Sequence, residues 1–234
     1  MRSAARACPA RRRARHGRGL LLPAAPVWRT GYDNMRMETV LFMANAFPLS
    51  YKAAVLNAIE TIDLEKVGQS IEILRRAREE GRHIFVCGNG GSASTASHFV
   101  CDMVKGASHG RPSRFRIMAL TDSLPTLTAY SNDVGYECVF VEQLKNFAEP
   151  GDVVMAISGS GNSPNVLRAV EYGNAIGCRT IALTGRNGGE LGRMAHLNLQ
   201  VSHPHMGRIE DAHMIVMHMI CYYFMDEEAP PVGL

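Results

Sequence analysis

Two short segments rich in glycine and serine are the parts of this sequence best suited to binding a phosphate group. The first runs from Gly88 to Ser94 and the second from Ser158 to Ser163, and each lies between a short apolar run and a helical pattern. Glycine lets the backbone approach a ligand closely, and the free N–H groups at the start of a helix attract an anion. Serine hydroxyls can add hydrogen bonds to phosphate oxygens.

The first loop, taken alone, is also compatible with two different structures. A tight strand-to-helix turn uses glycine in any case, and Gly88–Ala93 also fits the GxGxxA form of a dinucleotide fingerprint. However, no acidic residue stands about 20 residues beyond the loop to bind a ribose, because Asp122 lies about 30 residues on. The second loop lacks the GKS or GKT of a Walker A motif. Two such loops on one sheet indicate a small phosphorylated ligand, with each loop holding a different part.

A second set of residues offers metal ligands. His98 and Asp102 are four positions apart in a predicted helix and therefore share a face. Glu210 and His218 are eight apart in the last helical pattern, about 80° around the axis, so we expect both to reach one point. Two histidines and two carboxylates suit a divalent cation such as zinc. An exposed ion pair would also account for His98 and Asp102, but their position after a phosphate-type loop favours a functional role.

These residues must be positioned by alternating strands and helices. Five apolar runs predict buried strands, at 83–88, 115–121, 152–159, 179–185 and 197–202. Helical patterns cover 38–80, 92–105, 123–130, 137–147, 163–176, 188–195 and 207–225. Asp63 is expected to cap a helix and Gly81 to end one, and the largely apolar last helix should be central, with His213 in the core. The alternation predicts an α/β protein with a parallel sheet and ligands beyond the carboxyl ends of its strands.

Composition excludes several classes of protein. Hydrophobic residues make up 46% of the 234 residues and charged residues 20%, values that exclude a disordered chain, a collagen and a small disulfide scaffold. No unbroken apolar run reaches the roughly 18–20 residues of a membrane span, so we expect no membrane association. The six cysteines form no CxxC pair, which indicates reduced thiols and a cytoplasmic protein.

The first 36 residues differ from the rest. Residues 1–30 contain eight arginines and no acidic residue, so the remainder carries 17 basic and 22 acidic residues and is mildly acidic, which argues against nucleic acid as a partner. This N-terminal head, residues 1–36, could be a targeting peptide, a basic arm or a disordered tail. It could also lie outside the native protein, whose translation would then begin at Met35 or Met37. We therefore predict a disordered or non-native head over 1–36 and a single domain over 37–234.

Five motifs in a fixed order resemble the SIS (sugar isomerase) domain: GNGGSAS, NDVGYE, ISGSGNSPN, ALTGRNGGEL and RIEDAH. The sequence is most similar to the phosphoheptose isomerases, which interconvert sedoheptulose 7-phosphate and glycero-manno-heptose 7-phosphate. The resemblance implies a flavodoxin-like five-stranded parallel sheet with an N-terminal helical extension, and a homotetramer with sites at subunit interfaces. A related branch without isomerase activity regulates replication initiation, so a non-catalytic phosphosugar-binding regulator is the alternative.

The resemblance also implies roles for individual residues. The substrate would contact Asn89, Gly90, Gly91, Asn132, Asp133, Ser158, Gly159, Ser160, Ser163 and Glu210. Zinc would be bound by His98, Asp102, Glu210 and His218. Asp102 would be the base and His218 the acid of an aldose–ketose isomerisation through an enediol(ate). Asp102 stands where the family has glutamate and Glu210 where it has glutamine, and we expect Glu210 to share the base role because the Asp102 carboxylate is roughly 1.3–1.5 Å shorter in reach.

The head is predicted to be dispensable. Since it lacks an apolar period, a chain that begins at Met37 should keep the melting temperature and the ligand affinity of the full chain. Differential scanning fluorimetry with and without a sugar phosphate measures both quantities. A large loss of either would show that the head is part of the folded protein.

Overall fold

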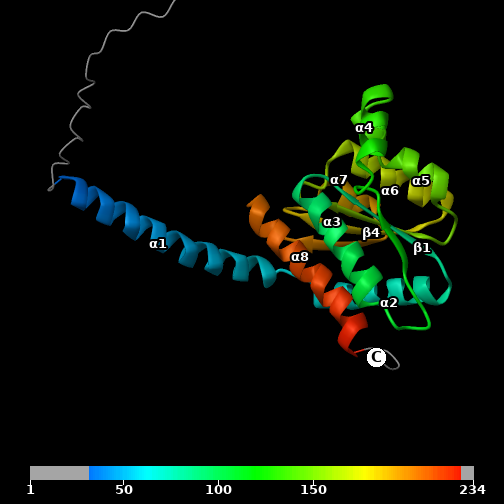
Figure 1. The fold of residues 1–234 in the computed structure, drawn as a ribbon, viewed down its shortest axis with the longest axis horizontal. Coiled ribbons are helices and arrows are strands. Elements are labelled where there is room, and N and C mark those ends of the chain that lie inside the picture. Colours follow the sequence, from blue (N-terminus) through cyan, green and yellow to red (C-terminus); the bar gives the residue numbers. More distant parts are fainter. Residues whose placement is uncertain (1–31, 228–234) are drawn as a thin grey trace, which may run out of the picture. The chain divides into compact units, whose positions relative to one another are not determined.

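A computed structural model describes residues 32–227 and contains one five-stranded sheet (Figure 1). Its strands are β1 His83–Gly88, β2 Arg116–Ala119, β3 Val153–Ser158, β4 Arg179–Gly185 and β5 Leu197–Val201. They are ordered β2-β1-β3-β4-β5, and every neighbouring pair is parallel. This is the flavodoxin-like order, so the predicted fold class and all five predicted strands are confirmed.

The helices follow the predicted pattern closely. They are α1 Tyr32–Ile59, α2 Leu64–Glu79, α3 Gly91–Cys101, α4 Leu124–Asp133, α5 Val141–Phe147, α6 Pro164–Ile176, α7 Gly189–Met194 and α8 Met206–Tyr222. Shorter turns add a 3₁₀ segment, Tyr136–Cys138, and two π-helical segments, Asp102–Gly106 and Tyr223–Glu227. Asp63 caps α2 as expected, because its carboxylate accepts a hydrogen bond from the Lys66 N–H at 3.2 Å.

The sheet is covered on both faces because successive side chains along a strand point in opposite directions. Ile84 and Val86 of β1 belong to a core cluster with residues of α2, α3 and α8. Phe85 and Cys87 belong to the opposite cluster, with residues of α5, α6 and α7. The helix α8 therefore packs against the same face of the sheet as α3, and the two helices contact each other (Figure 1).

Helix α1 begins earlier than predicted and is largely exposed. It starts at Tyr32, so the last residues of the expected head are helical, whereas residues 1–31 lie outside the described residues. The chain divides into two compact units, 1–46 and 47–234, within this helix.

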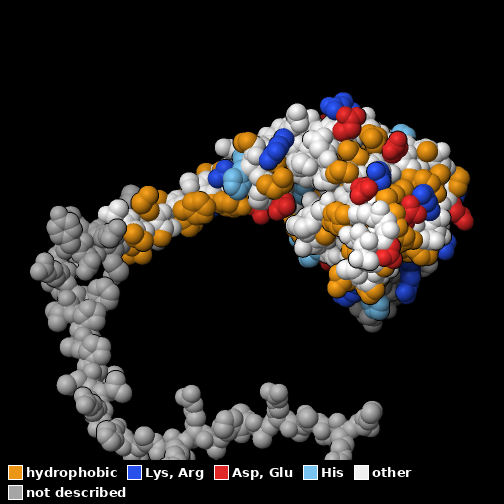
Figure 2. All heavy atoms as spheres, turned by 90° about the horizontal axis from the view of Figure 1, so that it is seen from above, with side chains coloured by type: hydrophobic (Ala, Val, Ile, Leu, Met, Phe, Trp, Pro, Cys, Tyr) orange, Lys and Arg blue, Asp and Glu red, His pale blue; other side chains and the backbone are white. Residues whose placement is uncertain are grey.

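Thr39–Ile59 is long and apolar enough to cross a membrane by length and composition alone, with a mean hydropathy of 1.3. The sequence did not predict such a segment, because polar residues interrupt it and no unbroken apolar run is long enough to span a membrane. Figure 2 shows hydrophobic side chains along α1.

His213 is a core residue, as the sequence predicted. Its side chain is 1% exposed, and its Nε2 lies 3.0 Å from the carbonyl oxygen of Thr184 on β4. A carbonyl only accepts hydrogen bonds, so Nε2 carries the proton of the neutral ring. Burial lowers the pKa of His213 to about 4, and the side chain is therefore uncharged at neutral pH.

This buried histidine should make the fold acid-sensitive. Its pKa in the folded protein is about 4, below the value of about 6.5 in an unfolded chain, so the unfolded state binds more protons between these values. The free energy of unfolding should fall as the pH drops from about 6.5 towards 4, by at most about 1.4 kcal/mol per pH unit from this group. His213→Gln keeps a donor for Thr184 but does not titrate. Urea unfolding at several pH values should give a shallower dependence for this variant, and identical slopes would contradict the assignment.

Candidate active site

The two glycine- and serine-rich loops meet at the carboxyl ends of neighbouring strands. In the β1–β3 register Gly88 pairs with Ile157, so both loops leave the sheet at the same level. Together they form a pocket of about 240 Å³. Eight predicted substrate-binding residues line it: Asn89, Gly90, Gly91, Ser158, Gly159, Ser160, Ser163 and Glu210. Ser92 of the first loop also lines it, as do Ile157 and Met206, and no pattern in the sequence singled out the last two as ligand contacts.

The second loop gathers three hydroxyl groups. Ser158 Oγ lies 3.3 Å from Ser160 Oγ and 3.4 Å from Ser163 Oγ. Ser163 occupies the N-cap position of α6, yet its hydroxyl makes no capping bond. It is therefore available to a ligand beside the positive dipole end of the helix, whose first residue, Pro164, has no N–H. Hydroxyls and a helix N-terminus without a lysine form a site for a phosphoryl group.

Two glycines lie where another atom comes very close, and at Gly161 that atom belongs to the backbone, so glycine is required there. Gly161 has φ +65°, and a Cβ there would lie 2.2 Å from the Gly188 carbonyl oxygen. At Gly91, a Cβ would lie 2.5 Å from a carboxylate oxygen of Glu210. The Glu210 carboxylate thus rests against the first turn of α3, inside the pocket. Since a carboxylate repels phosphate and accepts hydrogen bonds, this side of the pocket suits hydroxyl groups.

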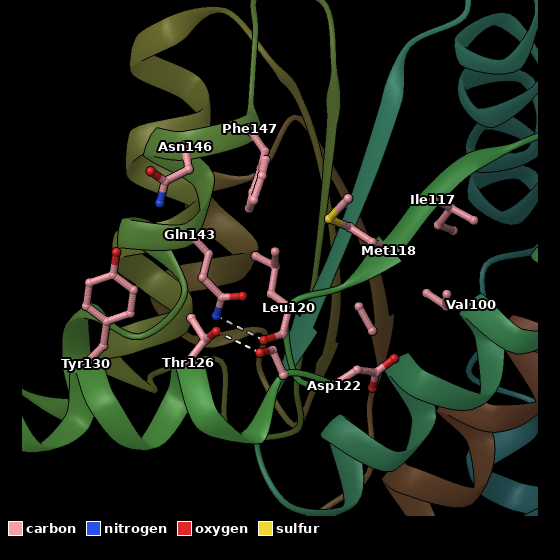
Figure 3. A pocket seen from close by; sticks show the side chains of 12 residues that line it. Val100, Ile117, Met118, Leu120, Asp122, Thr126, Tyr130, Gln143, Asn146 and Phe147 are labelled. Carbon is pink, nitrogen blue, oxygen red and sulfur yellow. Dashed lines mark hydrogen bonds between the residues drawn. The ribbon is translucent and has the colours of Figure 1, made fainter.

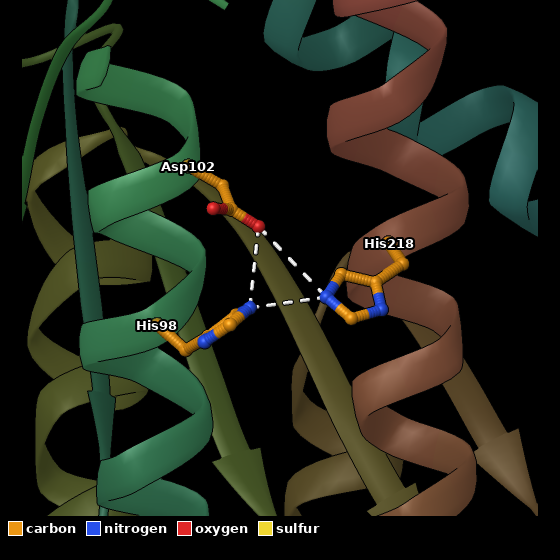
Figure 4. A group of neighbouring side chains, drawn as sticks. All are labelled: His98, Asp102 and His218. Carbon is orange, nitrogen blue, oxygen red and sulfur yellow. Dashed lines mark hydrogen bonds and ion pairs between the residues drawn. The ribbon is translucent and has the colours of Figure 1, made fainter. Parts of the chain in front are cut away.

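A second cluster joins α3 and α8 (Figure 4). His98 Nε2 lies 3.0 Å from His218 Nε2 and 3.3 Å from Asp102 Oδ2, and His218 Nε2 lies 3.8 Å from the same oxygen. The π-helical turn begins at Asp102, where the Ala107 N–H bonds to the Asp102 carbonyl oxygen five residues back. From α8, the buried thiol of Cys221 points to the same carboxylate oxygen at 3.6 Å. Burial raises the pKa of Cys221 to about 12, so the thiol stays protonated and can donate.

These three side chains fit a divalent metal ion. His98, Asp102 and His218 each direct one ligand atom towards a common point. A circle through the three atoms has a radius of about 2.0 Å, close to the roughly 2.0–2.2 Å of zinc–nitrogen and zinc–oxygen bonds. Two imidazole nitrogens and a carboxylate oxygen are also a donor set that zinc accepts. The predicted zinc ligands on α3 are thus brought together with one ligand on α8.

Glu210, the fourth predicted ligand, lies apart from this cluster. It lines the pocket between the loops, whereas none of the three clustered residues does. The reason is the helical rise: eight residues separate Glu210 from His218, which is about 12 Å along the axis of α8. The angular argument used on the sequence ignored this distance. Within one chain, the phosphate-type pocket and the metal-type cluster are therefore two adjacent parts of a site.

Asn132 and Asp133 do not line the pocket between the loops. They form the last turn of α4, which extends beyond its predicted end, and both side chains are exposed. The Asn132 amide donates to the Asp133 carboxylate at 2.7 Å.

A larger hollow of about 500 Å³ lies between β2, α4 and α5 (Figure 3). Phe147, Leu120 and Met118 supply apolar walls, and Asp122 supplies a carboxylate. The amide of Gln143 is held by the carbonyl oxygens of Leu120 and Val139. No glycine lines this hollow, so it lacks the close backbone approach that makes the loop pocket suitable for phosphate.

Comparison with known proteins identifies the family of this chain. Residues 49–185 match the SIS domain family. The chain is 36% identical over 182 residues to the phosphoheptose isomerase of Aliarcobacter butzleri, which covers 76% of this chain and 94% of that protein. The chain belongs to the SIS-domain family. Its phosphoheptose isomerase relatives also include the probable phosphoheptose isomerase of Thermoplasma volcanium, 40% identical over 164 residues, 70% of this chain and 82% of that protein.

Solved structures of two phosphoheptose isomerases share this fold over most of the chain. The phosphoheptose isomerase GmhA of Neisseria gonorrhoeae has a TM-score of 0.71 and 34% identity, covering 79% of this chain and 98% of that chain. The phosphoheptose isomerase of Francisella tularensis has a TM-score of 0.72 and 28% identity, with 80% and 98% covered. The chain is therefore a phosphosugar isomerase by class, and the resemblance noted on the sequence is confirmed.

The serine hydroxyls should carry the phosphate affinity. Replacing both Ser160 and Ser163 by alanine removes hydrogen bonds to a charged group, each worth roughly 1.5–3 kcal/mol. Calorimetric titration with a sugar phosphate should show at least a tenfold weaker Kd. Ser202→Ala is the matched control, because Ser202 lies outside the pocket. Equal affinity of the double variant and the parent would place the phosphate elsewhere.

Proposed function

We propose that this SIS-domain protein interconverts sedoheptulose 7-phosphate and glycero-manno-heptose 7-phosphate. The observation that carries the proposal is the pocket between the loops. Eight residues that the family resemblance predicted as substrate contacts line it, and three of them are serines, whose hydroxyls can bind a phosphate group. Relatives named phosphoheptose isomerase, matched over most of their length, support this substrate. The intact cluster of His98, Asp102 and His218 favours catalysis over a purely regulatory, phosphosugar-binding role.

The reaction needs one base and one group that moves a proton between oxygens. Asp102 removes the proton from the carbon beside the carbonyl, which leaves an enediol(ate), and the proton returns to the neighbouring carbon. His218 transfers the oxygen-bound proton. Each such group contributes roughly 10²–10⁴-fold to the rate. The Cys221 thiol, which points to Asp102, orients the carboxylate between the two imidazoles.

A divalent metal, with zinc as our choice, would be held by His98, Asp102 and His218. When bound, it would polarise the sugar carbonyl and orient the site. A carboxylate that binds a metal is a weaker base, so the metal-binding and base roles of Asp102 would alternate. Glu210 is the fourth ligand in this proposal and would come from a second copy of the chain, since the rise of α8 separates it from His218 of its own chain.

The proposed assembly is a homotetramer with active sites at subunit interfaces. His98 and His218 are 47% and 42% exposed, so the metal-type cluster is open to an approaching subunit. Large apolar side chains on α1, including Phe47, Leu49 and Leu56, are also exposed. Burial of such a surface between copies of the chain would remove it from water. Asn132 and Asp133, exposed at the end of α4, would contribute to a substrate site in the same way.

The proposed partner and compartment follow from charge and thiol chemistry. Residues 31–234 are mildly acidic, which favours a small phosphosugar over nucleic acid. Cys87, Cys101, Cys138, Cys178 and Cys221 are free thiols in the described part of the chain. Free thiols fit a reducing cytoplasm.

An isomerase assay on sedoheptulose 7-phosphate, with and without a chelator, tests the function. Conversion that a chelator abolishes and added zinc restores is the expected result. Binding of the sugar phosphate without conversion would favour the regulatory alternative. Absence of binding would contradict the substrate.

Variants at the two positions that depart from the family test the residue roles. Asp102→Asn should lower kcat about 100-fold or more, because it removes the base. Asp102→Glu restores the family's residue and should keep a bound metal and a measurable rate. If Glu210 completes the metal site, Glu210→Gln should lower the metal content measured by mass spectrometry or the rate. An unchanged rate for Asp102→Asn, or unchanged metal content and rate for Glu210→Gln, would contradict the corresponding role.

A further inference from the structure

A residue that lines no part of the pocket joins its two loops. Asn165, the second residue of α6, is 2% exposed. Its amide and that of Asn89 bond to each other twice: Asn89 Nδ2 donates to Asn165 Oδ1 at 2.9 Å, and Asn165 Nδ2 donates to Asn89 Oδ1 at 2.8 Å. The two residues are 76 positions apart. The pair therefore ties the first loop to the helix that follows the second.

The backbone sets the orientation of both amides. The N–H of Val166 lies 3.0 Å from Asn165 Oδ1 and donates to it. An N–H can donate to a carbonyl oxygen but not to an amide nitrogen, so Asn165 must turn its Nδ2 towards Asn89. The Asn89 atom that receives this N–H must then be its oxygen. The assignment of oxygen and nitrogen in both side chains thus follows from one backbone hydrogen bond.

Tyr136 uses the remaining acceptor capacity of Asn89. Its hydroxyl donates to Asn89 Oδ1 at 2.8 Å. An amide oxygen has two lone pairs, and Asn165 and Tyr136 occupy both. An amide nitrogen has two N–H groups, and only one of them goes to Asn165. Asn89, which lines the pocket, therefore has a single side-chain group left for a ligand, its second N–H.

We infer that Asn165 and Tyr136 are positioning residues that hold Asn89 as a hydrogen-bond donor to an oxygen of the bound sugar. The inference rests on the proposed function, and it specifies that Asn89 acts as a hydrogen-bond donor in the same pocket. The ligand atom that faces Asn89 must be an acceptor, such as a carbonyl or hydroxyl oxygen. The carbonyl oxygen of the sugar gains negative charge as the enediolate forms, and a donor that cannot rotate away stabilises such charge best.

Asn165→Asp tests the inference without a large change in shape. It keeps an oxygen for the Val166 N–H but places a second carboxylate oxygen opposite Asn89 Oδ1, and repulsion between the oxygens turns the Asn89 amide. A negative charge in the first turn of α6 is compatible with the helix dipole, so the variant should fold. In calorimetric titrations, the Kd for sedoheptulose 7-phosphate should rise about tenfold, the effect of one good hydrogen bond. The Kd for inorganic phosphate should rise less than this, because the new carboxylate repels both ligands but only the sugar phosphate loses the hydrogen bond from Asn89.

Two further variants show whether the effect passes through Asn89. Tyr136 is 54% exposed, so Tyr136→Phe should leave the fold intact, and it should raise the sugar-phosphate Kd by about threefold, since a hydrogen bond to a neutral group is weaker. In an Asn89→Ala background, Asn165→Asp should cost no more than about twofold, because residues that act through one another are not additive.

The outcomes separate this inference from the proposed function. A parent protein that does not bind sedoheptulose 7-phosphate overturns the proposed substrate, and the inference with it. A parent that binds, with Asn165→Asp and Tyr136→Phe binding equally well, overturns the inference alone. Equal losses for both ligands, or an undiminished loss in the Asn89→Ala background, also overturn it, because Asn165 would then support the fold of the loops rather than the position of Asn89.

Discussion

The active site depends on one feature of the sheet, the parallel pairing of β1 with β3. Parallel neighbours end at the same edge, so the loops that follow them can face one another. The pairing of Gly88 with Ile157 sets these loops at the same level. The reciprocal amide bonds between Asn89 and Asn165 then lock them together. An antiparallel pair would have placed the loops at opposite edges, where neither pocket nor amide pair could form.

Helix α8 distributes chemical groups along its length. Glu210, near its start, lies in the pocket between the loops, and His218, two turns later, lies beside α3. His213, between them in sequence, faces the sheet and stays neutral because it is buried. One helix therefore supplies a pocket-lining carboxylate, a core residue and a metal-type ligand, because successive positions face different surroundings. Within one chain, Glu210 and His218 therefore face two adjacent parts of the candidate site.

The cluster around Asp102 combines a short acidic side chain with a local widening of its helix. The helix widens into a π-helical turn at this residue, and Cys221 approaches its carboxylate from α8. Widened turns of this kind are frequent at functional sites. The carboxylate oxygen lies within 3.8 Å of both imidazole nitrogens.

Local spacing in the sequence was sufficient for the elements and for several contacts. The five strands, the Asp63 cap, the shared face of His98 and Asp102, and the core position of His213 all follow from periodicity or from residue type. Two features were decided only by the tertiary structure: the partnership of Asn89 with Asn165 across 76 positions, and the distance of Glu210 from the histidines. Strand order and helix packing create these relations between residues far apart in the chain, and no local pattern encodes which strands become neighbours.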